Sequence, residues 1–178
     1  MSSALTEAGA RWADLLASWA IPDEIVAQGE VPPWSHDPLT FAMDDTADPT
    51  HPIFEVAREL LPVDGGSVLD VGCGGGRSSL PLAPRATHIT GVDSSRAMLD
   101  QFAAAAERAR IGHREIEGRW PDVAIEAEAA GRPIEPVDVV VCHHVFYNVP
   151  DLEPFVVALT AVARLGVVVV LQIGRAHV

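Results

Sequence analysis

The sequence is poor in cysteine, with only Cys73 and Cys142 among its 178 residues. Two cysteines so far apart do not form the disulfide framework that stabilises small secreted domains. The first residues, 1–7, also lack the basic start and apolar stretch of a secretory signal peptide. These absences predict a cytoplasmic protein.

Basic residues and long apolar runs are scarce as well. The chain has 12 Lys and Arg against 25 Asp and Glu, a net charge of −13. Nucleic-acid binding depends on clustered Lys and Arg, and no such cluster is present. The longest apolar runs, such as residues 167–171, are far too short to cross a bilayer. We therefore expect a small-molecule partner, and neither nucleic acid nor a membrane.

What the sequence does contain is a glycine-rich motif at residues 68–76, Val-Leu-Asp-Val-Gly-Cys-Gly-Gly-Gly. The short apolar run around Asp70 is typical of a buried strand in a parallel sheet. Gly72, Gly74 and Gly76 allow positive φ and let the backbone approach a bound molecule. A helix is expected to begin near Ser78, shortened or kinked by Pro81. Strand, glycine turn and helix together predict a nucleotide-type cofactor site.

Strand and helix patterns alternate from residue 67 onward, which predicts a parallel sheet with helices on both faces. The expected strands are residues 68–71, 88–93, 113–117, 137–142 and 167–171. The expected helices are one capped by Ser94 or Ser95 and ended by Gly112, one over residues 122–130, and one over 152–162 capped by Asp151.

The N-terminal part, residues 1–51, has a different pattern. Apolar residues at helical spacing predict a helix over residues 5–19, a short one begins at Pro22, and a further helix covers residues 52–61. The Pro- and Asp-rich stretch between them is expected to be a loop holding Trp34 and Phe41. These aromatics either pack in the core or form a lid over the cofactor, and the sequence leaves both alternatives open.

The second expected strand ends in an acidic residue, which further supports a nucleotide-type cofactor site. Asp93 lies at the spacing at which a carboxylate binds both hydroxyls of an adenosine ribose, although it would also serve as a helix cap. A dinucleotide fingerprint, G-x-G-x-x-G, would require glycine at position 77, which is Arg77. An NAD-dependent oxidoreductase is therefore the second choice, and a non-catalytic cofactor-binding module is a third.

Three motifs together resemble the class I S-adenosylmethionine-dependent methyltransferases: residues 68–76, residues 91–95 with Met98 and Leu99, and residues 137–142. The resemblance covers residues 52–171, and the N-terminal segment is similar to the leader of uncharacterised actinobacterial-type members. The resemblance to the methyltransferases implies a doubly wound, mainly parallel Rossmann-like α/β sheet of order 3-2-1-4-5, in a domain over residues 52–172. The implied cofactor is S-adenosylmethionine and the implied reaction is methylation of a small molecule.

The resemblance also implies roles for individual residues. Asp70 and the glycine turn hold the methionine end of the cofactor, Asp93 the ribose, and Ser94 lies against the adenine. This sequence departs from the family at one point: the acid after the third strand that reaches the adenine amino group is replaced by Arg119 and Trp120. We expect Trp120 to stack on the adenine instead, and Glu117 or Asp122 to accept a hydrogen bond from the amino group. The expected cofactor-binding residues are Asp70, Gly72, Cys73, Gly74, Gly76, Asp93, Ser94, Met98, Trp120 and Cys142.

The loop after the fourth strand, residues 143–148, is the expected place for acceptor chemistry. Methyl transfer from a sulfonium is an in-line displacement, which needs a base only when the acceptor must lose a proton. His143, His144 and Tyr147 are the candidate bases; alternatively, one histidine packs on the cofactor and the other faces solvent. Cys142-His143-His144 has no partner at metal-ligand spacing, so no metal site is expected.

The C-terminal end suggests a truncated reading frame. The family's sheet continues with further strands, and without them residues 167–170 form an apolar edge of the kind that natural proteins avoid. Residues 173–178 resemble the translation of a sequencing adapter and are interpreted as a non-native tail. A genuine short C-terminus is the alternative.

Overall fold

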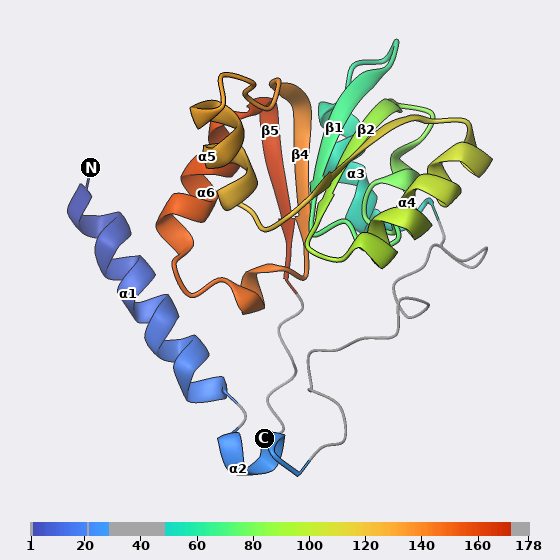
Figure 1. Ribbon diagram of the computed structural model, residues 1–178. Coiled ribbons are helices and arrows are strands. Elements are labelled where there is room, and N and C mark those ends of the chain that lie inside the picture. Colours follow the sequence, from blue (N-terminus) through green and yellow to red (C-terminus); the bar gives the residue numbers. More distant parts are fainter. Residues whose placement is uncertain (1, 21, 29–48, 172–178) are drawn as a thin grey trace.

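The computed structural model describes residues 2–20, 22–28 and 49–171 of the chain. Its centre is a five-stranded parallel sheet of order β3-β2-β1-β4-β5 (Figure 1). The strands are β1 (Gly66–Val71), β2 (Ala86–Asp93), β3 (Gly112–Glu117), β4 (Val137–His143) and β5 (Ala163–Val170). The expected fold and strand order are confirmed.

Helices connect the strands and precede the sheet. The α-helices are α1 (Ser2–Trp19), α2 (Asp23–Val26), α3 (Glu55–Leu60), α4 (Arg96–Ala109), α5 (Asp122–Ala129) and α6 (Leu152–Ala161). Single 3₁₀ turns are η2 (Pro52–Phe54), η3 (Leu80–Leu82) and η4 (Phe146–Asn148). No helix in the described part of the chain is long and apolar enough to span a bilayer.

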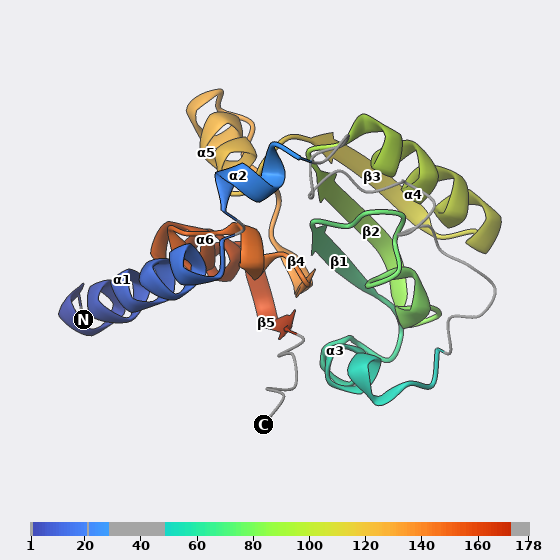
Figure 2. The ribbon, with the colours of Figure 1, turned by 90° about the horizontal axis from the view of Figure 1, so that it is seen from below.

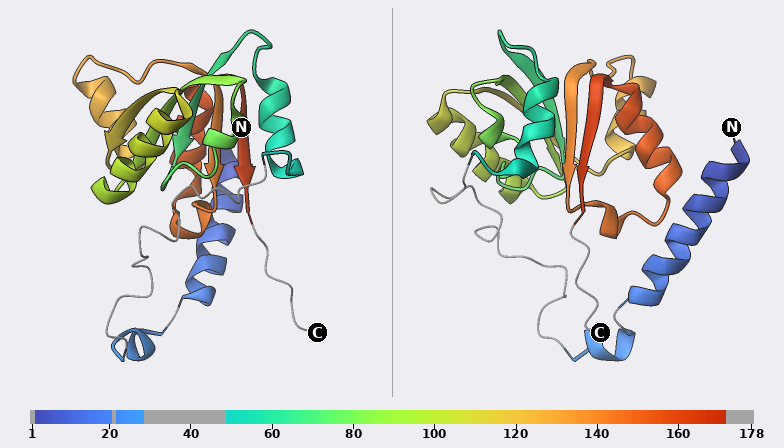
Figure 3. Two further views of the ribbon diagram at one scale, coloured as in Figure 1. Left: turned by 90° about the vertical axis from the view of Figure 1, so that its right-hand side faces the viewer. Right: turned by 180° about the vertical axis from the view of Figure 1, so that it is seen from behind.

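The sheet lies between two layers of helices, each of which closes a separate half of the core. On one face, α3, η3 and α4 cover a buried cluster that includes Val68 and Phe102. On the other face, α5 and α6 cover a cluster that includes Leu69 and Phe155. Val68 and Leu69 are neighbours in β1 and point to opposite faces, as the alternation of a strand requires. Figure 2 shows the sheet from its lower end with α1 outside α6, and Figure 3 shows α3 and α6 beside β5, which both contact.

The helix expected near Ser78 is absent from the structure. The chain forms only η3, and the backbone N–H of Ala83 donates to Leu80 O at its end. Pro81 has no N–H to donate and lies in the first turn of η3, so it does not itself break a helix there. The hydroxyls of Ser78 and Ser79 are engaged with Asp70 instead, as described below. The prediction that a helix N-terminus faces the cofactor site is therefore wrong.

Other expected boundaries are corrected by tertiary contacts. Ser95, and not Ser94, caps α4 by accepting from Met98 N, and α4 ends at Arg110 with φ +57° before Gly112 enters β3. Gly166 does not precede the fifth strand but lies within it, where a Cβ would come 2.9 Å from Leu60 Cδ1. The Asp151 side chain makes no capping hydrogen bond to α6.

The N-terminal helix is fixed to the domain by a tryptophan. Trp12 Nε1 donates to Val149 O at 2.8 Å. The half-buried Trp12 ring packs on the core cluster that α5 and α6 cover. The expected helices of residues 5–19 and following Pro22 are confirmed as α1 and α2. Trp34 and Phe41 of the expected lid, and the tail at 173–178, lie outside the described residues.

A serine–carboxylate clamp joins β1 to β4 at the end of the sheet where these strands begin. Asp138 Oδ2 accepts from Ser67 N at 2.7 Å and from Ser67 Oγ at 2.8 Å, and Asp138 N donates to Ser67 Oγ at 3.0 Å. Arg164 Nη1 lies 3.8 Å from Asp138 Oδ1. The backbone hydrogen bond from Ser67 holds the pKa of Asp138 below its ordinary value of 3.8.

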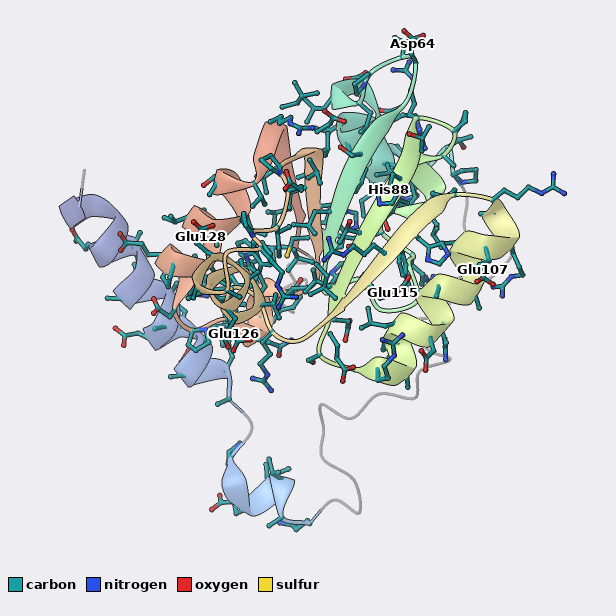
Figure 4. The ribbon with its side chains drawn as sticks, turned by 45° about the horizontal axis from the view of Figure 1, so that its top comes forward. Asp64, His88, Glu107, Glu115, Glu126 and Glu128 are labelled. Carbon is teal, nitrogen blue, oxygen red and sulfur yellow. The ribbon has the colours of Figure 1, made fainter. Side chains whose placement is uncertain are left out.

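Asp138→Ala should lower the free energy of unfolding by about 2 kcal/mol at pH 7, because the two Ser67 donors lose their acceptor. Since the folded pKa of Asp138 is lowered, this stabilisation is complete at neutral pH and is lost only as the pH falls below 3.8. Urea unfolding of both proteins at pH 7 measures the loss. Asp64→Ala, at the exposed tip of the turn before β1 (Figure 4), is the control and should change stability by less than about 0.5 kcal/mol. Equal losses in the two variants would contradict the clamp.

Candidate functional site

The candidate site lies where the strand order of the sheet reverses. The chain moves from β1 outward through β2 to β3, and then returns to β4 on the other side of β1 and continues to β5. In parallel sheets this reversal point, at the carboxyl ends of β1 and β4, is where a ligand crevice is expected. The glycine turn follows β1, and the loop of residues 143–148 follows β4 at the same edge.

The glycine turn has the backbone geometry that its residues predict. Gly72, Gly74 and Gly76 have φ of +72°, +51° and +91°. A Cβ at Gly72 would lie 2.3 Å from Val145 Cγ2, and one at Gly76 would lie 2.5 Å from Leu80 Cδ1. These two glycines are therefore required by conformation and by packing, and the turn brings bare backbone to the crevice.

Asp93 links the turn to the start of α4. Its Oδ2 accepts from Gly74 N at 3.0 Å, and its Oδ1 accepts from Ser95 N at 2.9 Å. The side chain is half-buried at the end of β2, and each carboxylate oxygen retains capacity for a second hydrogen bond. Asp93 therefore does bond to the start of α4, as the helix-cap alternative expects. Its carboxylate oxygens could still accept hydrogen bonds from the two hydroxyls of a ribose.

Asp70 is fully buried beneath the turn. Ser78 Oγ lies 2.9 Å and 2.8 Å from its two carboxylate oxygens, and Ser79 Oγ donates to Oδ2 at 2.6 Å. Burial raises the pKa of Asp70 to about 6, the two serine hydrogen bonds oppose that change, and the nearby charge of Asp93 adds to it. None of the surface of Asp70 is exposed, so its contacts are with the protein beneath the turn.

Five other residues assigned to the cofactor from the sequence are buried, and only Ser94 is exposed; the buried ones are Cys73, Gly76, Met98, Trp120 and Cys142. Cys142 is fully buried on the face covered by α5 and α6, and Trp120 on the same face donates from Nε1 to Phe155 O at 3.4 Å. Cys73 lies under the turn, where burial raises the pKa of its thiol. Met98 is 8% exposed in the first turn of α4. The indole of Trp120 is 7% exposed and packs in the core, and its expected contact with the adenine stays a prediction.

A row of aromatic rings crosses the carboxyl end of β4. Phe54 of η2 stacks on His143 with ring centroids 6.4 Å apart, and His144 stacks on Tyr147 at the same separation. Burial, together with the neighbouring His144, lowers the pKa of His143 to about 4. Its Nε2 is buried without a hydrogen-bond partner among the described residues.

His144 differs from His143 in its exposure and in its backbone conformation. It is exposed, it has φ of +60°, and its backbone N–H donates to Val170 O at 2.8 Å. Tyr147 is 36% exposed beside it. A residue other than glycine is strained in this conformation, and the hydrogen bond to the β5 backbone helps to offset that strain.

Comparison with known proteins assigns the family. Residues 69–171 match the family model described as a methyltransferase domain. The chain belongs to this methyltransferase family.

Curated relatives agree with the family match. The ubiquinone biosynthesis O-methyltransferase of Leptothrix cholodnii is 36% identical over 111 residues, which cover 62% of this chain and 45% of that enzyme. The enzyme of the same name from Coxiella burnetii is 31% identical over 109 residues, which cover 61% of this chain and 44% of that enzyme. The chain spans about half the length of the curated relatives it matches.

Solved structures show the same fold. Monomeric WbdD superposes with a TM-score of 0.53 at 20% identity, over 88% of this chain and 40% of that chain. Precorrin 8W decarboxylase from Methanobacterium thermoautotrophicum gives a TM-score of 0.50 at 18% identity, over 70% of this chain and 65% of that chain. At these identities the likeness concerns the fold alone.

Two further surfaces of this methyltransferase-family chain lie outside the crevice. An open groove between α1 and the start of α6 is lined by Gly9, Ala13 and Pro150 and by no residue of the glycine turn. Acidic side chains such as Glu107 and Glu126 lie on the exposed surfaces of α4 and α5 (Figure 4). Within the described ranges, no three His, Cys, Asp or Glu side chains gather as metal ligands.

Sequence reasoning missed the contacts that hold the turn in place. The pair Ser78-Ser79, two and three residues after Gly76, is the local signal for the anchoring of Asp70, and from the sequence it is expected to begin a helix. The stacking of Phe54 on His143 joins residues far apart in the chain, so no local pattern predicts it.

Asp70→Asn should remove a pH dependence of stability between pH 3.8 and about 6. Since the folded pKa of Asp70 is raised above 3.8, the folded state binds this proton more tightly, and the stability that Asp70 contributes falls as the pH rises through about 6. The wild type should therefore lose about 3 kcal/mol relative to Asp70→Asn across this window. Urea unfolding at half-unit pH steps measures it. Asp64→Asn, on an exposed turn, should follow the wild-type curve; a constant difference between wild type and Asp70→Asn would contradict the prediction.

Proposed function

We propose that this chain is an S-adenosylmethionine-dependent methyltransferase that methylates a small molecule, by in-line displacement at an oxygen atom. The observation that carries the proposal is the glycine turn at the reversal point of the sheet, with Asp93 bonded to its far side. The family match supports the reaction class, and the printed names of the relatives support an oxygen acceptor.

The residues at the crevice fit this cofactor. Gly72 and Gly74 present a backbone free of side chains, and Asp93 has the remaining acceptor capacity that two ribose hydroxyls require. Ser94 is exposed next to Asp93, where an adenine ring would lie. When bound, S-adenosylmethionine supplies a methyl group on a positively charged sulfur, and the protein has to align it with the acceptor and exclude water.

The loop after β4 provides the acceptor side of the site. Val145 packs directly on Gly72, so residues 143–148 border the position of the methyl donor. We assign proton removal from the acceptor to His144, with Tyr147 stacked beside it, because both are exposed. His143 is poorly suited to this role, because a pKa of about 4 makes it a weak base at neutral pH.

The remaining proposals concern the organisation and setting of the chain. Residues 52–172 form the cofactor-binding domain, and residues 1–51 form a helical segment beside it, an arrangement supported by the bond from Trp12 to Val149. The protein acts in the cytoplasm on a small molecule and not on nucleic acid, in keeping with its net charge of −13. The oxidoreductase alternative finds no support in the family match.

Asp93→Ala should weaken the binding of S-adenosylhomocysteine by at least about tenfold, because the ribose loses its acceptor. Isothermal titration calorimetry on the 178-residue chain measures the dissociation constant. Ser95→Ala removes only the helix-capping hydroxyl and should leave binding within about threefold, which separates loss of the ribose contact from loss of the α4 cap. Absence of binding by the wild type at millimolar ligand, or binding of NAD in its place, would overturn the proposal.

His144→Asn should lower the methylation rate of a hydroxyl acceptor by about a hundredfold, because asparagine tolerates the left-handed backbone but removes no proton at neutral pH. Acceptors are identified first by incubating a metabolite mixture with methyl-labelled S-adenosylmethionine. His143→Asn is the matched control, and we expect it to reduce stability through lost packing on Phe54 more than it reduces the rate. A greater loss of rate in His143→Asn would reverse the assignment.

A further inference from the structure

We propose that Ser78 and Ser79 are positioning residues for the methyl donor: acting through Asp70, they hold the glycine turn in the conformation that binds it. This inference rests on the proposed function. It assigns the serines a role that is distinct from ligand contact, because Ser79 and Asp70 have no exposed surface and Ser78 is 8% exposed.

The first support is that the serines satisfy a buried carboxyl group. A carboxyl out of water is unfavourable unless its oxygens accept hydrogen bonds. Ser78 Oγ lies 2.9 Å and 2.8 Å from the two oxygens of Asp70, and Ser79 Oγ donates to one of them at 2.6 Å. Among the side chains whose hydrogen bonds the structure describes, these two hydroxyls hold Asp70 in place.

The second support is that this anchoring closes the turn at its base. Asp70 is two residues before Gly72, and the serines are two and three residues after Gly76. Within the closed segment, Gly76 N donates to Cys73 O at 2.8 Å, and Leu80 N donates to Gly76 O at 3.0 Å. The side-chain contacts between Asp70 and the serines therefore fix where the chain leaves the turn.

The third support is that the turn has an independent brace on its other side. Gly74 N donates to Asp93 Oδ2 at 3.0 Å, and Gly72 N donates to Val92 O at 2.8 Å. Loss of the serine hydroxyls leaves these bonds to β2 intact. The fold should therefore persist in serine variants while the exit of the turn becomes free to move.

The chain contains its own control for a purely structural role. Ser67 of β1 and Asp138 of β4 form a second serine–carboxylate pair, at 2.8 Å between Ser67 Oγ and Asp138 Oδ2, at the end of β1 opposite to Asp70. Ser67→Ala should lower the free energy of unfolding by about as much as Ser78→Ala or Ser79→Ala. It lies too far along β1 to alter the turn.

The test compares Ser79→Ala, Ser78→Ala and Ser67→Ala in the 178-residue chain, with S-adenosylhomocysteine as the probe. Calorimetry gives the dissociation constant and urea unfolding gives the stability of each variant. We expect Ser79→Ala to weaken binding by about tenfold and Ser78→Ala by a smaller factor. Ser67→Ala should lose comparable stability with binding unchanged.

Two further measurements separate positioning from a general loss of stability. Ser79→Thr retains the hydroxyl and should bind more tightly than Ser79→Ala. Hydrogen exchange followed by NMR, on the protein without ligand, should show faster exchange of the Gly76 amide in Ser79→Ala than in Ser67→Ala.

The outcomes distinguish this inference from the proposed function. Wild-type binding together with unchanged binding in both Ser79→Ala and Ser78→Ala overturns the inference alone. Weaker binding in Ser67→Ala, equal to that in Ser79→Ala, also overturns it, because stability alone would then explain the loss. Absence of binding by the wild type overturns the proposed function and this inference with it.

Discussion

Burial of the Asp70 carboxyl group at the end of the central strand is the constraint on which the candidate site depends. β1 is paired on both sides, so a side chain near its carboxyl end that points into a helical layer has no path to water. Such a group has to find its hydrogen bonds within the protein. Ser78 and Ser79 supply them, and in doing so they draw the chain after the glycines back against β1.

This requirement explains why η3 replaces a regular helix. The Ser78 and Ser79 hydroxyls bond to Asp70, and such side-chain hydrogen bonds compete with a regular helix for the conformation of the backbone. The segment therefore makes one 3₁₀ turn and continues to β2. The segment after β1 thus presents glycine backbone at the crevice in place of a helix N-terminus, and the Asp93 carboxylate beside it accepts from Ser95 N at the start of α4.

The sequence predicted the sheet well because the apolar runs and the glycine turn are local signals. The strand order follows once the resemblance places residues 68–76 on the central strand, and the structure agrees with it. Tertiary contacts decided what the sequence did not predict. Gly166 lies within β5 with Leu60 packed where its side chain would be, and the indole of Trp120 packs in the layer formed by α5 and α6, where its Nε1 donates to Phe155 O. The direction in which a loop residue points depends on partners far along the chain, which no local pattern records.

The two sides of the candidate site are mechanically connected. Val145 occupies the space next to Gly72, where a Cβ would meet Val145 Cγ2 at 2.3 Å, so the loop after β4 and the glycine turn share a surface. His144 precedes Val145 and is held by Val170 of β5, which fixes the loop from its other side. In-line displacement requires donor and acceptor to be aligned to within fractions of an ångström. A loop fixed between the turn and the edge strand would meet that requirement, because the proposed base and the backbone proposed to receive the donor are positioned by adjacent residues.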